Sequence, residues 1–442
     1  MQLTVRRPDS LTGELAVPGD KSISHRALIL NSIAQGKALV TGLSDGEDVM
    51  STLGCLRAMG VVIEPGGQPG AFNVNGRGRD MEEPDGILDA GNSGTSMRLL
   101  SGLLAGQSFT SVITGDDSLR SRPMGRVVQP LLQMGATVMG RHGDTLAPLT
   151  IRGGALKGIE YDLPVASAQL KSCIMLAGLS ARGDTILRQP ALSRDHTERM
   201  VSAMGGSVTA DGLTLVVRPA QLQAVDIAVP GDISSAAFWL VAGLCHPNSR
   251  VLVTSVGLNP SRTGIIDSLV AMGAGEGLRL LNQRAEGGEP VADLLVTSTR
   301  LSGIEIGGAM IPRILDEIPV LAVAACFAEG VTVIRDAKEL RVKESDRIET
   351  TVSELTKMGA HIEAREDGMV IYGTGGGTGG LTGGLKGSVC DSHRDHRLAM
   401  ALGVAGLVSP GETVINGAED ASISYPTFWE HLASLSGNGT EG

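Results

Sequence analysis

Two kinds of apolar pattern alternate along the chain, and each predicts a different kind of helix. In one, Val49, Leu53, Leu56 and Met59 are separated by 4, 3 and 3 residues, and residues 348–358 repeat that spacing. Apolar residues that recur about once per helical turn form a single apolar face, which predicts an amphipathic helix at a surface. The other pattern is apolar nearly all round, which predicts helices buried on every side. It occurs six times, at residues 27–33, 97–105, 173–179, 236–244, 320–327 and 398–407.

These helices belong to a repeated unit: a polar loop, a buried helix, a glycine, a strand, an amphipathic helix and then Met-Gly. The Met-Gly pairs are Met59-Gly60, Met134-Gly135, Met204-Gly205, Met272-Gly273 and Met358-Gly359, and Ser436-Gly437 ends a degenerate sixth copy. A glycine directly after a helix predicts a left-handed C-terminal cap. A spacing of about 70 to 85 residues is too long for a solenoid and suits a supersecondary unit repeated around an axis.

The chain is also duplicated as two halves of three units each. The segment 17–20, Val-Pro-Gly-Asp, returns at 229–232, and 18 residues separate Thr41 from Met59 and Thr254 from Met272 alike. We therefore predict an α/β protein of two similar domains. One domain comprises residues 1–19 and 232–442, the other comprises residues 20–231, and the chain crosses between them near 18–21 and 229–232.

Polar and basic residues gather where the buried helices begin and, in the same units, on a loop, after a strand and at the start of an amphipathic helix. The segments are 20–26 (DKSISHR), 90–98 (AGNSGTSMR), 120–124 (RSRPM), 166–171 (ASAQLK), 193–196 (SRDH), 232–235 (DISS), 316–317 (DE), 341–347 (RVKESDR) and 395–397 (DHR). Helix N-termini attract anions through their exposed N–H groups and dipoles, so converging N-termini would form an anion-binding site. Each segment also has a simpler interpretation as a helix cap with solvated charges, and the pair at 316–317 is either a cap or a catalytic base.

Composition narrows the function further. A net charge of -11 argues against nucleic-acid binding, and 2% aromatic residues leave few stacking platforms for bases. The 29 arginines against 8 lysines suit two-pronged binding of carboxylates and phosphates. Metal-ligand spacing and nucleotide-binding motifs are both missing, and the glycine-rich segment 374–384 lacks the lysine of a phosphate-binding loop. We expect no metal and no cofactor.

Location follows from the same data. Five widely spaced cysteines indicate reduced, buried thiols, charged residues interrupt the first 20 positions, and the longest apolar run, 319–328, is too short to span a bilayer. We therefore expect a cytoplasmic protein that contacts no membrane. Because no unexplained apolar stripe remains on the surface, we expect a monomer.

The polar segments resemble those of the enolpyruvyl transferase family, and within it the branch that acts on shikimate 3-phosphate. The similar segments are 18–26, 91–98, 122–124, 167–169, 341–347 and 395–397, in matching order and spacing. The resemblance implies two domains, each of three βαβαββ units around buried parallel helices (an inside-out α/β barrel), with the active site in the interdomain cleft. It implies transfer of the enolpyruvyl group of phosphoenolpyruvate to the 5-hydroxyl of shikimate 3-phosphate, with release of phosphate.

The resemblance also implies roles for individual residues. Shikimate 3-phosphate would be bound by Lys21, Ser22, Arg26, Ser167, Ala168, Gln169, Arg194, Asp316 and Lys343. Phosphoenolpyruvate would be bound by Lys21, Asn92, Gly94, Thr95, Arg122, Gln169, Arg347 and Arg397. Asp316 would accept the proton of the 5-hydroxyl, Glu344 would exchange a proton with the methylene carbon, and Lys21 would assist as an acid. The only implied partners are small anionic substrates.

The chain departs from many members of that family at two places. It has Ile423 where they carry a lysine, so one phosphate-binding cation is missing or supplied elsewhere, with Lys171 as the candidate. Residues 193–196 replace a tyrosine-containing stretch. Both departures resemble the glyphosate-tolerant branch, although Gly94 stands where that branch often carries alanine. We hypothesise that glyphosate inhibits this protein more weakly than members with the lysine.

Two other functions fit the sequence less well. A UDP-N-acetylglucosamine enolpyruvyl transferase commonly carries a cysteine in the loop that is here 115–124, and this loop has none. A non-catalytic phosphosugar-binding protein would lack the two acids Asp316 and Glu344, and both are present.

Overall fold

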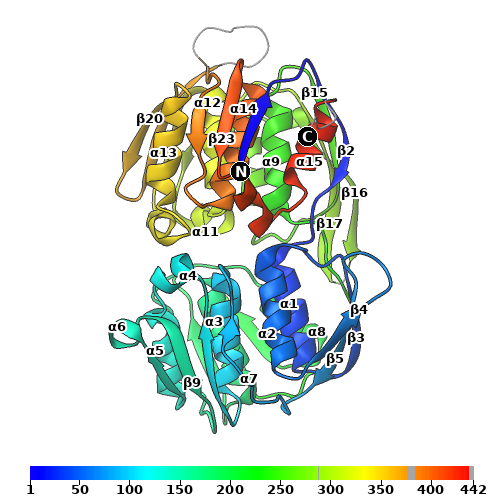
Figure 1. The fold of residues 1–442 in the computed structure, drawn as a ribbon, viewed down its shortest axis with the longest axis vertical. Coiled ribbons are helices and arrows are strands. Elements are labelled where there is room, and N and C mark those ends of the chain that lie inside the picture. The colour runs from blue at the N-terminus through cyan, green and yellow to red at the C-terminus, as the bar shows by residue number, and fades with distance from the viewer. Residues whose placement is uncertain (287, 376–383, 438–442) are drawn as a thin grey trace. The chain divides into compact units, whose positions relative to one another are not determined.

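Six buried helices organise the part of the chain that the structure describes, three in each of two units (Figure 1). The computed structural model describes residues 1–286, 288–375 and 384–437, so most of the glycine-rich segment 374–384 lies outside the described residues. The backbone divides into one unit made of Met1–Pro18 and Pro230–Gly442 and another made of Gly19–Val229. Each unit has its own hydrophobic core.

The unit of residues 19–229 places three buried helices against three sheets. The helices are α1 (Lys21–Ser32), α3 (Gly94–Ala105) and α7 (Ala168–Ser180), and the amphipathic helices are α2 (Glu47–Ala58), α5 (Gly125–Met134) and α8 (His196–Ala203). The sheets have the orders β14-β3-β5-β4, β6-β7-β9-β8 and β10-β11-β13-β12. Their strands are β3 (Gln35–Thr41), β4 (Val62–Pro65), β5 (Phe72–Arg77), β6 (Leu88–Asp89), β7 (Thr110–Thr114), β8 (Thr137–Gly140), β9 (Leu146–Arg152), β10 (Glu160–Asp162), β11 (Thr185–Arg188), β12 (Val208–Asp211), β13 (Thr214–Val217) and β14 (Ile227–Ala228).

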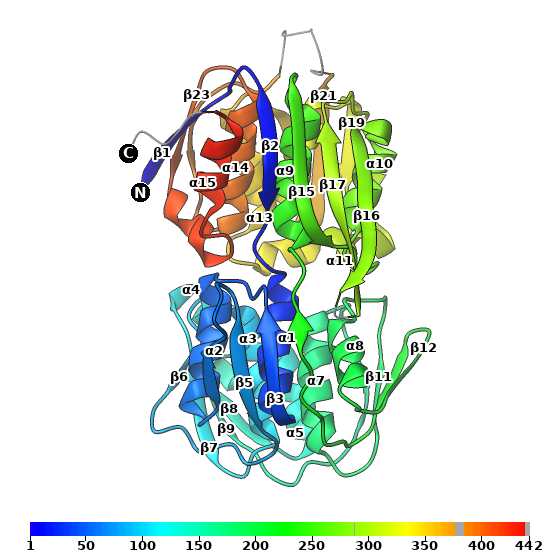
Figure 2. The ribbon, with the colours of Figure 1, turned by 90° about the vertical axis from the view of Figure 1, so that its right-hand side faces the viewer.

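The other unit repeats this plan. Its buried helices are α9 (Ile233–Cys245), α12 (Ile318–Phe327) and α14 (His396–Val408), and its amphipathic helices are α10 (Gly264–Ala271), α13 (Arg347–Lys357) and α15 (Phe428–Leu435). The sheets have the orders β16-β17-β15-β2, β18-β19-β21-β20 and β1-β23-β22, and the first of them faces the viewer in Figure 2. Their strands are β1 (Gln2–Arg6), β2 (Leu11–Ala16), β15 (Ser249–Gly257), β16 (Leu278–Glu286), β17 (Glu289–Thr297), β18 (Glu305–Ile306), β19 (Glu329–Ile334), β20 (His361–Arg365), β21 (Gly368–Thr374), β22 (Val389–Asp391) and β23 (Glu412–Asn416).

Each four-stranded sheet has the same pairing. One edge strand runs parallel to the strand that follows the buried helix, and two further strands add on the other side of that strand as an antiparallel hairpin. The predicted mixed α/β fold with repeated βαβαββ units is therefore confirmed. Helices lie inside and sheets outside, as an inside-out arrangement requires, but across the described residues the sheets remain separate and close no barrel.

Two sheets recruit strands that are distant in the sequence. β2 pairs in parallel with β15, from Leu11 beside Ser249 to Ala16 beside Thr254. In the degenerate sixth copy no hairpin follows α15 among the described residues, and β1 pairs with β23 instead. The unit that contains the N-terminus therefore needs both ends of the chain to complete its sheets.

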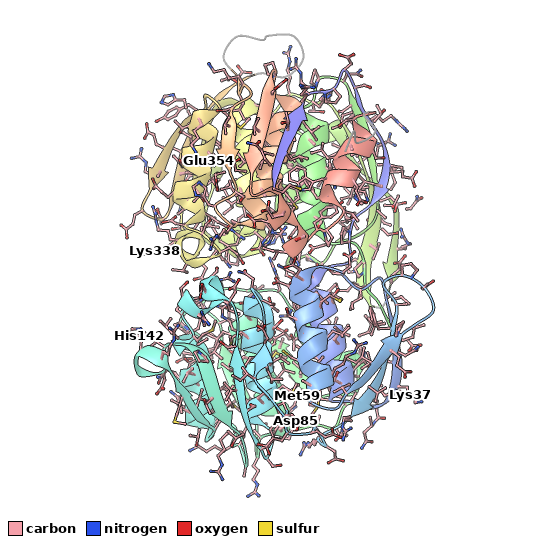
Figure 3. The ribbon with its side chains drawn as sticks, viewed as in Figure 1. Lys37, Met59, Asp85, His142, Lys338 and Glu354 are labelled. Carbon is pink, nitrogen blue, oxygen red and sulfur yellow. The ribbon has the colours of Figure 1, made fainter. Side chains whose placement is uncertain are left out.

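The glycines after the amphipathic helices have the predicted left-handed backbone. Gly60 and Gly135 have φ values of 80° and 101°, and the four corresponding glycines of the other copies also have positive φ. Met59, which precedes the first of them, follows the last residue of α2 and is buried (Figure 3). The Met-Gly pair thus ends the helix and anchors its end in the core.

The buried helices begin between two and six residues earlier than their apolar patterns indicated. In α1 the polar residues Lys21 to Arg26 form the first turns of the helix rather than a loop before it. The apolar pattern missed these turns because their side chains are polar and are held by caps and hydrogen bonds. In α1 the polar segment is therefore part of the helix itself.

The cysteine thiols lie in the protein interior. All five cysteines are free and buried, and burial raises the pKa of Cys245 and Cys326 to about 12. None of the described helices is long and apolar enough to cross a membrane.

α3 and α7 pack closely at Gly102, and a substitution there tests how much this contact matters for stability. A Cβ added to Gly102 would lie 2.1 Å from the carbonyl oxygen of Cys173, which belongs to backbone and cannot swing away. We expect Gly102→Ala to lower the free energy of unfolding by about 3 kcal/mol, as overpacking does. Gly54→Ala is the control, because Gly54 lies in α2 with no atom within 4 Å of the added carbon. This control should gain up to about 1 kcal/mol, and equal thermal unfolding midpoints for the two variants would contradict the expected close contact.

Candidate functional site

In the unit of residues 19–229, the N-termini of the three buried helices meet. Gln169, in the first turn of α7, accepts a hydrogen bond from Arg98 Nη1 at 2.5 Å and donates one to Thr95 Oγ1 at 2.8 Å, both on α3. Arg26 of α1 donates from Nη2 to Ser172 Oγ of α7 at 2.8 Å. The predicted convergence of helix starts therefore holds within this unit, and it concentrates N–H groups and positive dipole ends in one place.

Three of the polar residues are helix caps, as the simpler interpretation required. Asp20, Ser93 and Ser167 accept hydrogen bonds from the backbone N–H groups of residues three positions later, at 2.8, 3.1 and 3.3 Å. The neighbouring cations are not solvated, however. Arg26 is buried, and Lys21 forms an ion pair with Asp48 at 2.9 Å. The segments thus combine caps with cations that protein groups hold in place.

One cluster in this unit contains Ser22, Arg26 and Arg194. Arg194, which precedes α8, donates from Nη1 to Ser22 Oγ at 3.2 Å, and Arg26 Nη1 donates to the Ser22 carbonyl at 2.9 Å. Ser167 and Ala168 lie at the start of α7 and directly precede Gln169 in the sequence. Two guanidinium groups and a hydroxyl at a helix start form a set of donors that suits a phosphate ester.

A second cluster contains Asn92, Gly94 and Arg122. Arg122 is buried and donates from Nη2 to Asn92 Oδ1 at 2.6 Å and to Ser118 Oγ at 3.1 Å. A Cβ on Gly94 would lie 3.4 Å from Arg122 Nη1 and 2.9 Å from Arg98 Nη1. Glycine at this position therefore leaves two guanidinium groups room beside the N-terminus of α3.

In the other unit, Arg347 collects three carboxylates. This side chain is only 2% exposed. Nε donates to Asp395 Oδ2 at 2.8 Å, Nη2 donates to Glu344 Oε2 at 2.6 Å, and Nη1 donates to Asp316 Oδ1 at 3.4 Å. Burial alone would lower the pKa of Arg347, but Asp395, Glu344 and Asp316 raise it well above its ordinary value. The two expected catalytic acids thus share one permanently charged guanidinium.

The adjacent pair Asp316 and Glu317 divides between two roles. Glu317 is fully buried and accepts a hydrogen bond from Ser234 Oγ near the start of α9, where Asp232 caps the helix by accepting from the Ser234 N–H at 2.8 Å. Buried Arg262 supports this structural group by donating to Asp232 at 2.9 Å. Asp316 faces Arg347 instead, so only one acid of the pair contacts the functional cluster.

Arg397 and Lys343 complete the cations of this unit. Arg397 lies in the first turn of α14, and its buried Nη1 has no hydrogen-bond acceptor among the described residues. A buried guanidinium nitrogen without an acceptor is costly, so this N–H group is a candidate donor to a bound anion. Lys343 is half-buried, and burial lowers its pKa despite the nearby carboxylate of Asp316.

The sequence interpretation of residues 341–347 needs a correction. It placed this segment at the start of a helix, but α13 begins at Arg347, and Lys343 and Glu344 precede it. Lys338, at the start of the preceding 3₁₀ helix (Lys338–Val342), is exposed (Figure 3). Asp346 caps α13 by accepting from the Glu349 N–H at 3.1 Å. Because α13 begins only after this capping aspartate, Glu344 lies outside the helix, and its side chain accepts a hydrogen bond from Arg347.

Lys171 is not the substitute for the missing cation. It is 1% exposed, forms an ion pair with Glu198 Oε1 at 2.5 Å and donates to the Ser193 carbonyl at 3.3 Å. With its ammonium group occupied by protein acceptors, Lys171 is unavailable to a substrate phosphate, so this prediction was wrong. Ile423, at the position of the family lysine, ends a 3₁₀ helix (Ala418–Ile423).

Several supporting residues escaped the sequence analysis. Asp48 pairs with Lys21 from 27 residues away, and Thr197 accepts from Arg26 Nε at 2.7 Å across 171 residues. Asp395 belongs to the predicted segment 395–397 but was given no role of its own, although it accepts a hydrogen bond from Arg347 Nε. No local pattern signals such partners, because they are neighbours only in the folded chain.

Comparison with known proteins agrees with this geometry. The sequence pattern of the family described as EPSP synthase (3-phosphoshikimate 1-carboxyvinyltransferase) matches residues 5–432. A 3-phosphoshikimate 1-carboxyvinyltransferase of Bacillus cereus (strain B4264) is 52% identical over 429 residues, covering 97% of both chains. The structure of EPSP synthase from Acinetobacter baumannii has a TM-score of 0.86 and 44% identity, covering 99% of this chain and 98% of the other.

A more distant structure shares the fold alone. The enolpyruvyl transferase NikO from Streptomyces tendae has a TM-score of 0.78 at 19% identity, covering 98% of this chain and 97% of the other. The family match and the 52% identical relative place the chain in the class of carboxyvinyl (enolpyruvyl) transferases. Within that class, the matches over nearly the whole length show that the chain belongs to the EPSP synthase family.

Proposed function

We propose that this protein transfers the enolpyruvyl group of phosphoenolpyruvate to the 5-hydroxyl of shikimate 3-phosphate and releases phosphate. Family membership supports the reaction, and one structural observation carries the chemistry: Arg347 holds the two acids Asp316 and Glu344 on a single buried guanidinium. The reaction needs two opposed proton transfers at neighbouring atoms. Two carboxylates at one fixed cation are suited to that task.

The proposed binding of shikimate 3-phosphate uses donors of two kinds. Arg194 and Arg26, which both contact Ser22, would hold the phosphate group by charge-assisted hydrogen bonds. The start of α7 and residues near Asp316 would bind the ring hydroxyls. The full proposed set is Lys21, Ser22, Arg26, Ser167, Ala168, Gln169, Arg194, Asp316 and Lys343.

Phosphoenolpyruvate carries a phosphate and a carboxylate, and the proposed set is correspondingly rich in cations. It comprises Lys21, Asn92, Gly94, Thr95, Arg122, Gln169, Arg347 and Arg397. The unsatisfied Nη1 of Arg397 offers one anion a ready donor. Bringing two anions together against their repulsion is the main energetic task, and preorganised cations contribute most to it.

The proposed chemistry proceeds by addition and then elimination. The 5-hydroxyl oxygen bonds to C2 of phosphoenolpyruvate while Asp316 accepts the hydroxyl proton and Glu344 donates a proton to C3. This gives a tetrahedral intermediate with a methyl group. Glu344 then takes a proton back from that methyl group, the C2–O bond to phosphate breaks, and Lys21 protonates the departing phosphate.

A phosphate-release assay tests the proposal. The purified protein should release phosphate from phosphoenolpyruvate with shikimate 3-phosphate as acceptor, and none with UDP-N-acetylglucosamine. Release with the UDP-sugar would favour the sister activity, and binding without release would favour a phosphosugar-binding protein. Weaker glyphosate inhibition than in a relative carrying the lysine at position 423 stays a prediction for the same assay.

We also infer that the protein acts as a monomer in a reducing cytoplasm. Support comes from the five free, buried cysteines, whose burial suits a compartment without disulfide formation. Sedimentation equilibrium should give a mass near that of one chain, 45.6 kDa. A stable dimer would contradict this inference without affecting the proposed reaction.

Space at Gly94 gives a test of phosphoenolpyruvate binding. In Gly94→Ala the new methyl group would press on Arg98 and Arg122, whose guanidinium groups must shift by a few tenths of an ångström. We expect the KM for phosphoenolpyruvate to rise about tenfold, the usual effect of one misplaced methyl group, with little change in the KM for shikimate 3-phosphate. Gly86→Ala, with no atom within 4 Å of the added carbon, is the control. Equal rises in the two KM values would indicate general distortion instead.

A further inference from the structure

One buried ion pair ties three elements together behind the Ser22 cluster. Lys171 on α7 pairs with Glu198 on α8 at 2.5 Å, and the same ammonium group donates to the carbonyl of Ser193 at 3.3 Å. Ser193 belongs to the segment between β11 and α8. The charge of Lys171 is therefore used entirely inside the protein.

The carbonyl that Lys171 holds is part of the peptide group joining Ser193 to Arg194. Because a peptide group is planar, fixing this oxygen also fixes the direction in which the Arg194 N–H and Cα leave. Arg194 in turn places Nη1 3.2 Å from Ser22 Oγ. The segment is attached on either side as well, by Ser193 Oγ to Gln189 Oε1 at 2.9 Å and by the hydroxyl of Thr197, which accepts from Arg26.

The energetics of the pair favour a geometric role over a stabilising one. Removing two charges from water is expensive, and a buried ion pair typically stabilises a fold no better than apolar groups of the same size. Here Glu198 Oε2 is also buried without a hydrogen-bond partner among the described residues, which adds to the cost. What the ion pair does provide is a defined position for the Ser193–Arg194 peptide group.

We propose that Lys171, acting with Glu198, is a positioning residue that aims Arg194 at the phosphate group of the bound sugar phosphate. This inference rests on the proposed function, because it assigns that phosphate to Ser22 and Arg194. It links Lys171 to the segment 193–196, which is one of the departures from the family pattern. Lys171 fixes the segment 193–196, and Arg194 in that segment binds the phosphate ester.

The test replaces the pair with neutral side chains of similar size. Lys171→Met together with Glu198→Gln leaves no unpaired buried charge, so the protein should still fold. We expect the KM for shikimate 3-phosphate to rise about tenfold, as when one charge-assisted hydrogen bond is weakened. The kcat and the KM for phosphoenolpyruvate should stay within about twofold. With shikimate, which lacks the phosphate, kcat/KM should not change.

A double-mutant comparison decides whether the effect passes through Arg194. In an Arg194→Ala background, neutralising the pair should add nothing further to the KM for shikimate 3-phosphate. Lys157→Met, at an exposed lysine of the same unit, controls for the loss of a lysine that does not contact the Ser193–Arg194 peptide. Lys171→Arg keeps the ion pair if the neutral pair fails to fold, and its bulkier head should still raise the same KM.

Three results would overturn the proposal: an unchanged KM for shikimate 3-phosphate, an equal loss with shikimate, or a full effect that persists without Arg194. A wild-type protein that fails to turn over these substrates would instead contradict the proposed function. The two failures are therefore distinguishable.

Discussion

Glu344→Gln lowers kcat by about three orders of magnitude, while both substrates still bind with affinities close to those of the wild type. The glutamine keeps the size of the side chain and can still accept the hydrogen bond from Arg347 Nη2. It has no proton to exchange with the methylene carbon. The expected loss therefore falls on the chemical step, which single-turnover kinetics and calorimetric titration of each substrate would separate from binding.

Asp316→Asn should give a loss of similar size through the other proton. Asp316 lies 3.4 Å from Arg347 Nη1, and this permanent cation favours the ionised base. Glu349→Gln is a matched control, since Glu349 is an exposed residue in the first turn of α13. A kcat within tenfold of wild type for either site variant would remove that residue from the catalytic assignment.

Arg347→Met has the largest expected effect on stability and abolishes turnover as well. Methionine fills much of the space but leaves Asp395 buried without its cation and releases Glu344 and Asp316. Removing one partner of a buried ion pair typically costs about 3 to 5 kcal/mol, because the remaining charge stays uncompensated. Urea unfolding should report a loss of this size.

Arg341→Met is the control for this prediction. Arg341 pairs with Asp346 at 2.7 Å in a half-exposed position six residues from Arg347. Solvent screens such a pair, so its loss should cost no more than about 1 kcal/mol and leave kcat nearly unchanged. If both arginine variants lose the same stability, Arg347 contributes as a surface pair would, and the central role given to it is wrong.

The sequence was sufficient to predict most of the architecture. The all-apolar helices and the Met-Gly pairs recur at regular intervals, and both have simple physical meanings: burial on every side and a left-handed cap. Gly60 and its counterparts adopt the expected φ, and the starts of α1, α3 and α7 meet as expected. Periodicity reports reliably on structure that repeats.

The partners of individual charges could not be predicted in this way. Lys171 looked like a replacement for the missing lysine at position 423, but its pairing with Glu198 depends on how α8 packs against α7. The start of α13 at Arg347 depends on a cap at Asp346 rather than on the run of charges. Such details come from contacts between elements far apart in sequence, and the resemblance to a family supplied roles for residues without supplying these contacts.

The pairing of β1 and β2 with strands made much later has a consequence for biosynthesis. Residues 19–229 are contiguous, so this segment can collapse as soon as it emerges from the ribosome. The other unit cannot, because β2 must wait for β15 and β1 must wait for β23, which is made some 400 residues later. During translation β1 therefore remains an unpaired strand with exposed N–H and C=O groups, a target for chaperones until β23 arrives.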